Sequence, residues 1–322
     1  MKNKSSEKIY IILVNYKGNN DTITCIDSVL ESTYQNYQLI VVDNSPDEEY
    51  SLQLYKDLKY KKIKSCKINE NEISKNLKSL IDSKVIIIRQ NKNGGFASAN
   101  NVGIKYGLLR KDSMGFILLN NDTEIKKDTV SELVNSYSKY GNDNCYGGKI
   151  FYYSEPDKIW YDDGSFNYIT GKAKHRNLNC VDKTNISQIY ETQFITFCYV
   201  LIPLKIIEEI GLIEEKYFMY CEDLDYCYRC VMANKKLLIN PNSIVYHKVG
   251  SSSGGQLTEF SAYWSYKNEI RFNLARKDKL KIVALLYLFF TRPLIYLKWL
   301  LKRKINIGNI MIKATHDALN NK

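Results

Sequence analysis

Short apolar runs alternate with segments of helical spacing along the first 120 of the 322 residues, and this pattern limits the fold more than any other feature. Four runs have the length and composition of strands covered on both faces: residues 9–14, 38–42, 85–88 and 115–119. Residues 21–31 and 96–109 lie between these runs and have the spacing of amphipathic helices. Repeated strand–helix–strand units predict an α/β fold with a parallel sheet and right-handed crossovers.

Polar side chains follow three of the predicted strands. Asn15 and Tyr16 follow the first strand, Asp43 and Asn44 end the second, and residues 120–122 follow the last. Ligands of such sheets bind beyond the carboxyl ends of the strands, where the strand ends meet. We therefore expect these residues to converge at a ligand site.

The rest of the chain predicts smaller elements. Residues 48–83 are rich in Lys and weakly apolar, which predicts a helix and a surface excursion. Residues 145–193 are rich in Tyr, Asp, Gly and Asn, and we expect irregular loops with short strands there. The pattern further along predicts two helices and two short strands: residues 203–210 and 222–233, then 236–239 and 244–246.

The net charge of +11 is concentrated near the C-terminal end. Residues 276–322 hold 11 of the 46 Lys and Arg and only two acidic residues, so this stretch carries +9. It is also rich in Leu, Phe, Tyr and Trp, which is typical of a helix on an anionic membrane surface rather than of nucleic-acid binding. We predict a main domain over residues 1–275, a basic amphipathic helical tail over 276–322, and no nucleic-acid partner.

Two other arrangements of the tail stay open. The uncharged run 282–291 would be roughly 15 Å long as a helix, about half of a hydrocarbon core, which disfavours a membrane span. The tail could instead be an apolar helix packed on the domain.

The eight cysteines have no pattern that requires a metal or disulfide framework. The N-terminal sequence MKNKSSEKIY lacks the apolar segment of a signal peptide, so we expect reduced thiols. Cys227 and Cys230 have the spacing of a zinc-binding pair, but a second pair at similar spacing is missing. Buried thiols are therefore the favoured interpretation.

Two segments have residues that suit a phosphate-bearing ligand. Asn93, Gly94 and Gly95 precede a predicted helix, where glycines let the backbone and its free N–H groups approach an anion. Asp122 follows a strongly apolar strand, and a carboxylate there can ligate a divalent cation that holds a diphosphate. Alone, each also fits a structural role, as a plain loop or as a helix cap.

Three carboxylates and one histidine are candidates for catalysis. Glu222, Asp223 and Asp225 open a predicted helix, and three acids exceed what capping requires. Close like charges raise one another's pKa, which suits a general base, and Arg229 is placed to pair with Asp225 at i+4. His247, one of three histidines, follows an apolar strand and could ligate a metal, although a lone histidine is more often structural.

Taken in order, these segments resemble glycosyltransferase family 2, in particular its bacterial rhamnosyltransferase-like branch. The resemblance runs from Ile9 to about Lys277. It rests on these residues: 14–16, 41–45, 93–97 with 100–103, 118–123, 210–212, 218–220, 222–225 with Arg229, His247 with Ser252, and 266–269.

The resemblance implies a GT-A fold, in which a Rossmann-like nucleotide-binding sheet merges with an acceptor-binding half. It implies the following roles: Asp43 on the donor base; Asn15, Tyr16, Asn93, Gly94, Asn101 and Asn121 in the nucleotide pocket; Asp122 and His247 as ligands of Mg²⁺ or Mn²⁺; Asp223 as the catalytic base; Glu222 and Asp225 orienting the acceptor or the base. The chain departs from the family pattern in three places: Asn120-Asn121-Asp122 in place of a full D-x-D, Lys267-Asn268 in place of Arg-Asn, and a longer insert around residues 56–83.

The resemblance also implies an inverting, divalent-metal-dependent glycosyltransferase that uses dTDP-rhamnose or a UDP-hexose. We expect a lipid-linked saccharide or a growing cell-surface polysaccharide, such as O-antigen or capsule, as the acceptor. We expect a cytoplasmic protein, peripheral on the cytoplasmic face of the bacterial inner membrane. The alternative is a catalytically inactive nucleotide-sugar-binding subunit of a polysaccharide assembly complex, which the intact Glu222–Asp223 pair disfavours.

Overall fold

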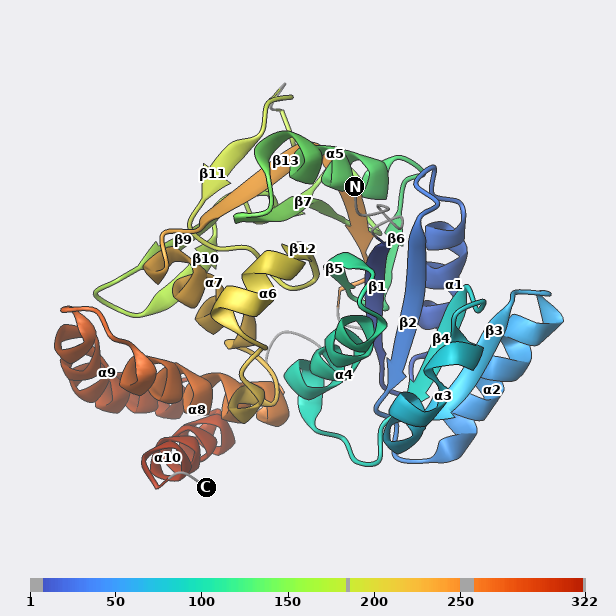
Figure 1. Ribbon diagram of the computed structural model, residues 1–322. Coiled ribbons are helices and arrows are strands. Elements are labelled where there is room, and N and C mark those ends of the chain that lie inside the picture. Colours follow the sequence, from blue (N-terminus) through green and yellow to red (C-terminus); the bar gives the residue numbers. More distant parts are fainter. Residues whose placement is uncertain (1–7, 184–185, 250–257, 321–322) are drawn as a thin grey trace.

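The computed structural model describes residues 8–183, 186–249 and 258–320. Residues 1–7 and the Gly- and Ser-rich segment 250–257, which contains Ser252, lie outside the described residues. Within the described ranges, a mixed 11-stranded sheet runs through the molecule and helices flank it (Figure 1).

The first half of the sheet is parallel. Its strands follow the order β5-β1-β2-β4-β3: β5 (Ser113–Leu119), β1 (Lys8–Asn15), β2 (Tyr37–Asp43), β4 (Val85–Arg89) and β3 (Ser65–Asn69). Its helices are α1 (Asn19–Leu30), α2 (Glu48–Tyr60), the short η1 (Glu70–Glu72), α3 (Ile73–Leu80) and α4 (Gly95–Arg110). The four predicted strands and both predicted helices are confirmed. The edge strand β3 lies where we expected only a helix and a surface excursion.

The second half of the sheet is mixed. From β5 it continues through β12 (Tyr199–Pro203), β7 (Asn144–Tyr152), β13 (Lys236–His247) and β11 (Tyr190–Thr192), with β6 (Thr123–Ile125) beside β13 and β8 (Ile159–Tyr161) beside β7. A separate hairpin joins β9 (Gly164–Asn167) and β10 (Lys172–His175). Two expectations are corrected here. The central strand β7 occupies part of the segment expected to be irregular, and the two predicted short strands form one strand, β13, with an irregularity between Asn240 and Ile244.

The remaining helices are as follows: α5 (Thr129–Tyr140), α6 (Leu204–Ile210), η2 (Glu215–Tyr217), α7 (Glu222–Met232), α8 (Glu259–Ala275), α9 (Lys281–Leu301) and α10 (Ile305–Leu319). α10 packs along α8, and α9 lies beside them at the lower left of Figure 1. Arg276, where we placed the domain boundary, is 2% exposed and donates to Asp278 and to the carbonyl oxygen of Tyr168. The start of the tail is therefore anchored in the main body of the protein.

Candidate active site

A cleft of about 810 Å³ lies beyond the carboxyl ends of the parallel strands. It is lined by residues of both halves of the sheet and by the segment before α7. Seven of the twelve predicted site residues line it: Tyr16, Asn93, Asn121, Asp122, Glu222, Asp223 and His247. The expected convergence of polar residues at this edge is thus confirmed.

Asp122 and His247 meet at one end of the cleft. Asp122 lies in the turn between β5 and β6, His247 ends β13, and the pairing of β13 with β6 brings them together. His247 Nε2 lies 3.2 Å from Asp122 Oδ1, and both side chains are 7% exposed. Among the described residues, no group of three or more His, Cys, Asp or Glu forms a metal site.

The pair nevertheless fits two positions of a divalent cation. Two adjacent ligands of an octahedral ion, each about 2.1 Å from it, are about 3 Å apart. The observed 3.2 Å is close to that separation. A carboxylate oxygen and an imidazole nitrogen form a donor set that suits Mn²⁺. The remaining ligands would have to come from water and the donor diphosphate.

The surroundings of His247 fix its ring. Burial lowers the pKa of His247, but the neighbouring Cys198 and the Asp122 carboxylate outweigh burial and raise it, so a metal ion that binds Nε2 would have to displace a proton. The Trp160 ring meets the imidazole edge-on, with centroids 4.5 Å apart. His247 Nδ1 is buried and has no hydrogen-bond partner among the residues that the structure describes.

Glu222 and Asp223 form an acidic pair at the first turn of α7. Glu222 is 6% exposed, and Asp223 Oδ1 accepts the backbone N–H of Leu224 at 2.8 Å. Burial raises the pKa of both carboxyls, and the charge of Asp223 raises that of Glu222 further. The two carboxyls therefore hold a proton more tightly as a pair than either would in water. A carboxylate of raised pKa that lines an open cleft is suited to accept a proton from a ligand hydroxyl.

A strained turn presents this pair to the cleft. Phe218, Tyr220 and Cys221 have left-handed φ values of 60°, 68° and 70°, which cost roughly 1–2 kcal/mol each in a non-glycine residue. Asn268 of α8 is fully buried beneath them. Its Nδ2 lies within hydrogen-bond distance of three carbonyl oxygens: Tyr217 (2.6 Å), Met219 (2.8 Å) and Tyr220 (3.0 Å). This amide therefore holds the turn in its strained form.

Gly95 joins the turn to the nucleotide side of the cleft. The N–H of Phe96 donates to the carbonyl oxygen of Phe218 at 2.7 Å. Gly95 has φ +86°, and a Cβ at this position would lie 2.1 Å from the same oxygen. Only a residue without a side chain fits here, which explains the second glycine of the Gly94-Gly95 pair.

Asp225 lies behind the acidic pair rather than in the cleft. It accepts from the Tyr217 hydroxyl at 2.9 Å and from Arg229 Nε at 2.8 Å, and it is 4% exposed. The predicted ion pair with Arg229 is confirmed. Arg229 also donates to the carbonyl oxygens of Ile210 and Leu212, so the pair ties α7 to the end of α6.

Four residues assigned to the nucleotide pocket do not line the described cleft: Asn15, Asp43, Gly94 and Asn101. Asn15 Nδ2 donates to Asp43 at 2.9 Å, and Asp43 also accepts from Ser45 and lies 3.5 Å from Arg89. Asn101 exchanges hydrogen bonds with the backbone of Ile213. The structure places these three side chains behind the wall of the cleft, where they hold its loops together.

Two aromatic residues of the cleft were not predicted from the sequence. Trp160 lies between His247 and His175, with its ring centroid 4.9 Å from that of His175. His175 Nδ1 lies 2.8 Å from the Trp160 carbonyl oxygen. The only signal was scarcity, since the chain has three Trp and three His. The Trp160 ring meets both imidazoles edge-on, so it fixes the wall of the cleft beside the Asp122–His247 pair.

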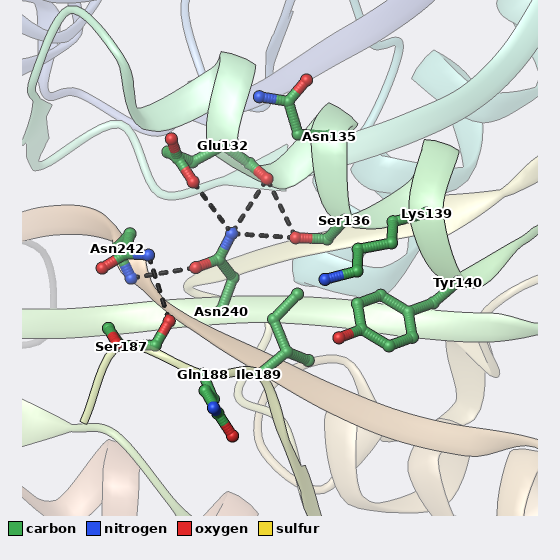
Figure 2. A pocket seen from close by; sticks show the side chains of 10 residues that line it. All are labelled: Glu132, Asn135, Ser136, Lys139, Tyr140, Ser187, Gln188, Ile189, Asn240 and Asn242. Atoms are coloured by element: carbon green, nitrogen blue, oxygen red, sulfur yellow. Dashed lines mark hydrogen bonds between the residues drawn. The ribbon is translucent and has the colours of Figure 1, made fainter.

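A second pocket, of about 470 Å³, lies between α5, residues 187–189 and β13 (Figure 2). Its central side chain, Asn240, donates to the carbonyl oxygen of Glu132 and to Ser136 Oγ, both at 2.9 Å. None of the predicted site residues lines this pocket, and it lacks a paired or buried carboxylate. The cleft is therefore the candidate active site.

Comparisons with known proteins agree with this geometry. The family model "Glycosyl transferase family 2" matches residues 10–211. Glycosyltransferase GlyG of Streptococcus pneumoniae is 23% identical over 81% of this chain and 76% of its own length. The hexosyltransferase Agl10 of Haloferax volcanii is 25% identical over 71% of this chain and 63% of its own length. The dTDP-rhamnosyl transferase RfbF of Shigella flexneri is 24% identical over 53% of this chain and 54% of its own length.

Two solved structures share the fold. GalNAc-T7, crystallised with UDP, GalNAc and Mn²⁺, has a TM-score of 0.64 at 17% identity and covers 86% of this chain. S. aureus TarS has a TM-score of 0.52 at 11% identity and covers 88%. The chain spans less than half the length of either structure, 49% and 43%. Since the family model covers more than half of the chain, the chain belongs to glycosyl transferase family 2, and its sheet has the GT-A fold.

Proposed function

We propose that this chain moves a sugar, with inversion at the anomeric carbon, from a nucleotide-diphosphate donor to a lipid-linked or growing cell-surface polysaccharide. The observation that carries the proposal is the single cleft that holds both the Asp122–His247 pair and the Glu222–Asp223 pair. A diphosphate holder and a proton acceptor in one cleft are the two functions that such a transfer requires.

Asp223 acts as the base in this proposal. Its carboxylate faces the cleft and takes the proton of the acceptor hydroxyl while that oxygen attacks the anomeric carbon. Burial and the charge of Asp223 raise the pKa of Glu222, which favours the arrangement in which Glu222 carries a proton and Asp223 is the free carboxylate. The Asp225–Arg229 ion pair and Asn268 hold the first turn of α7 in position.

Asp122 and His247 would hold the metal ion. When bound, Mg²⁺ or Mn²⁺ neutralises charge that develops on the departing nucleoside diphosphate. The Mn²⁺ named in the GalNAc-T7 structure supports a divalent ion in a neighbour of the same fold. Trp160 keeps the His247 ring in place at the edge of this site.

The donor is proposed as dTDP-rhamnose or a UDP-hexose. RfbF is named as a dTDP-rhamnosyl transferase and Agl10 as a hexosyltransferase, and both names support this choice. A panel of dTDP-rhamnose, UDP-glucose, UDP-galactose and UDP-N-acetylhexosamines, each with and without Mn²⁺, tests it. We expect metal-dependent release of nucleoside diphosphate from one member.

The same panel tests the alternative of an inactive nucleotide-sugar-binding subunit. Tight binding of a donor without release of nucleoside diphosphate or transfer would favour that alternative. Full turnover in excess EDTA would contradict the metal requirement. The configuration of the product at the anomeric carbon, read by NMR, tests inversion.

We also propose that the tail attaches the enzyme to the cytoplasmic face of the bacterial inner membrane. α9 is long and apolar enough to cross a membrane by length and composition, but its buried Arg292 is ion-paired with Glu269 of α8 at 2.6 Å. Trp299 Nε1 also donates to the Tyr266 hydroxyl. These contacts hold α9 against α8, and they favour a helix that lies on the membrane surface over one that crosses the membrane.

The exposed apolar residues of α9 support this arrangement. At 100° per residue, they fall within a sector of about 140°. The most exposed are Ile282, Phe289, Phe290, Leu294 and Leu301. Lys298 lies next to this face and residues 302–304 follow the end of α9, and these basic side chains would meet anionic headgroups.

Flotation with phosphatidylglycerol and phosphatidylcholine vesicles tests the attachment. We expect full-length protein to float with the anionic vesicles, and the Phe289→Glu/Phe290→Glu double variant to remain in solution. Leu52→Glu, at an exposed apolar site on α2, is the matched control and should float as the wild type does. Equal, salt-insensitive binding to both vesicles would indicate an inserted span, and no binding to either would indicate a tail that only packs on the domain.

A further inference from the structure

α8 carries a buried lysine that has no carboxylate within ion-pair distance among the described residues. Lys267 is 4% exposed, and its Nζ donates to the Tyr263 hydroxyl at 3.0 Å. Within residues 8–183, 186–249 and 258–320, no carboxylate lies within 4 Å of this ammonium. A buried charge of this kind is costly unless an anion pairs with it.

The neighbouring charges increase the positive excess. Arg271 is one turn further along α8, and Lys313 of α10 lies over the Tyr263 ring, 5.8 Å from its centroid. Burial lowers the pKa of Lys267, and the charges of Arg271 and Lys313 lower it further. The nearby carboxylate of Asp317 accepts a hydrogen bond from the Tyr263 hydroxyl at 2.7 Å. The negative charge of Asp317 raises the pKa of Lys267, but the pKa stays below its usual value. Lys267 and Lys313 therefore act on one nearby carboxylate, Asp317.

An aromatic wall joins this cationic cluster to the cleft. Phe218 and Phe260 line the cleft, and Phe218 stacks on Trp264 with centroids 4.7 Å apart. Trp264 in turn lies over the Lys267 ammonium, 4.9 Å from the ring centroid. The cluster is thus on the side of the Glu222–Asp223 turn, which Asn268, the next residue, also contacts.

We propose that Lys267, supported by Lys313, binds a phosphate group carried by the acceptor, and that Phe218, Phe260 and Trp264 contact the hydrocarbon next to that phosphate. The proposal rests on the proposed transfer to a lipid-linked acceptor. A phosphate ester would supply the anion that Lys267 lacks, and charge-assisted hydrogen bonds of this kind are the strong ones. The donor diphosphate is assigned to the Asp122–His247 pair on the other half of the sheet, so it does not need this cluster.

Calorimetric titration with octyl phosphate tests the site, because this probe combines one phosphate with a short alkyl chain. Octanol, inorganic phosphate and UDP are titrated in parallel with the full-length protein. We expect Lys267→Met to weaken octyl phosphate binding about tenfold to a hundredfold, the usual effect of losing a hydrogen bond to a charged group. Lys267→Arg should retain binding within a few-fold, and Lys313→Met, at an exposed position, should show a smaller loss. Lys75→Met, an exposed lysine of α3, is the matched control and should bind as the wild type does.

Three results would overturn the proposal. Unchanged octyl phosphate binding in Lys267→Met would mean that Lys267 only links α8 to α10. An equal loss of UDP binding in that variant would assign the lysine to the donor diphosphate. If inorganic phosphate bound as tightly as octyl phosphate, the alkyl chain would contribute nothing to binding, and the aromatic side chains would have no role in the site. The donor panel separates this test from the proposed function, since metal-dependent donor turnover is measured without any acceptor.

Discussion

Substitution of Gly95 by Ala tests whether the two halves of the cleft are joined as the structure shows. A Cβ at Gly95 would lie 2.1 Å from the carbonyl oxygen of Phe218 and 2.7 Å from its carbonyl carbon, so the backbone must move apart. Positive φ in a non-glycine residue costs roughly 1–2 kcal/mol. Overpacking typically costs a further 1–3 kcal/mol, and loss of the Phe96–Phe218 hydrogen bond about 1 kcal/mol. We expect the free energy of unfolding to fall by about 3–6 kcal/mol.

Gly211→Ala is the matched control. Gly211 has φ +89°, and a Cβ there would have nothing within 4 Å, so only the same backbone strain of roughly 1–2 kcal/mol applies. Urea denaturation of both variants measures the difference, and UDP titration measures the effect on the cleft. Gly95→Ala should be the less stable by at least about 2 kcal/mol and should bind UDP more weakly. Equal stability of the two variants, with unchanged UDP binding, would refute the close contact between Gly95 and Phe218.

Three further predictions concern the acidic pair, the metal site and the strained turn. Burial raises the pKa of Glu222 from 4.5 to about 8, so the native state keeps a proton that the unfolded chain has released between these pH values. The free energy of unfolding therefore falls as the pH rises from 4.5 to about 8. Glu222→Gln should make that slope shallower in urea denaturation between pH 6 and pH 8, although the raised pKa values of His247 and Asp223 keep part of it. A slope unchanged from the wild type would contradict the raised pKa of Glu222. Asp122→Ala should weaken the binding of both Mn²⁺ and UDP in calorimetry. If the variant binds both as the wild type does, Asp122 is not part of the donor site. Asn268→Ala should lower turnover and destabilise the fold by about 1–3 kcal/mol, because three carbonyl oxygens lose their donor, and wild-type turnover would contradict its role in holding the turn.

The parallel half of the fold was predictable because its strands are covered on both faces. Such strands read as continuous apolar runs, and β1, β2, β4 and β5 all do so. The strand β3 escaped prediction because it is an edge strand of five residues that pairs only with β4 among the described strands, and its sequence SCKIN has two buried positions. β7 was missed because Gly147 and Gly148 interrupt its apolar pattern. Gly148 is required there, since a Cβ would lie 2.2 Å from the carbonyl oxygen of Ser243.

The charged residues of the site were predictable, whereas its supporting contacts were not. Asp122, Glu222, Asp223 and His247 all line the cleft, because the strand and helix ends that carry them open into it. Asp43 and Asp225 also lie at a strand end and a helix start, yet they pair with Arg89 and Arg229 instead. Asn101 lies in the segment that the resemblance assigns to the nucleotide pocket. Its side-chain amide instead donates a hydrogen bond to the backbone of Ile213, 112 residues further along the chain. Such long-range hydrogen bonds leave no periodic signal in the sequence.

The rate of sugar transfer by Asp223→Asn tests the central claim most directly. With the donor identified by the panel, we expect turnover to fall by roughly 10²-fold or more, the usual contribution of a general base. UDP and Mn²⁺ binding should stay within a few-fold of the wild type, because Asp122 and His247 are untouched. Near-wild-type turnover in Asp223→Asn would contradict the claim and would move the role of the base to another group in the cleft.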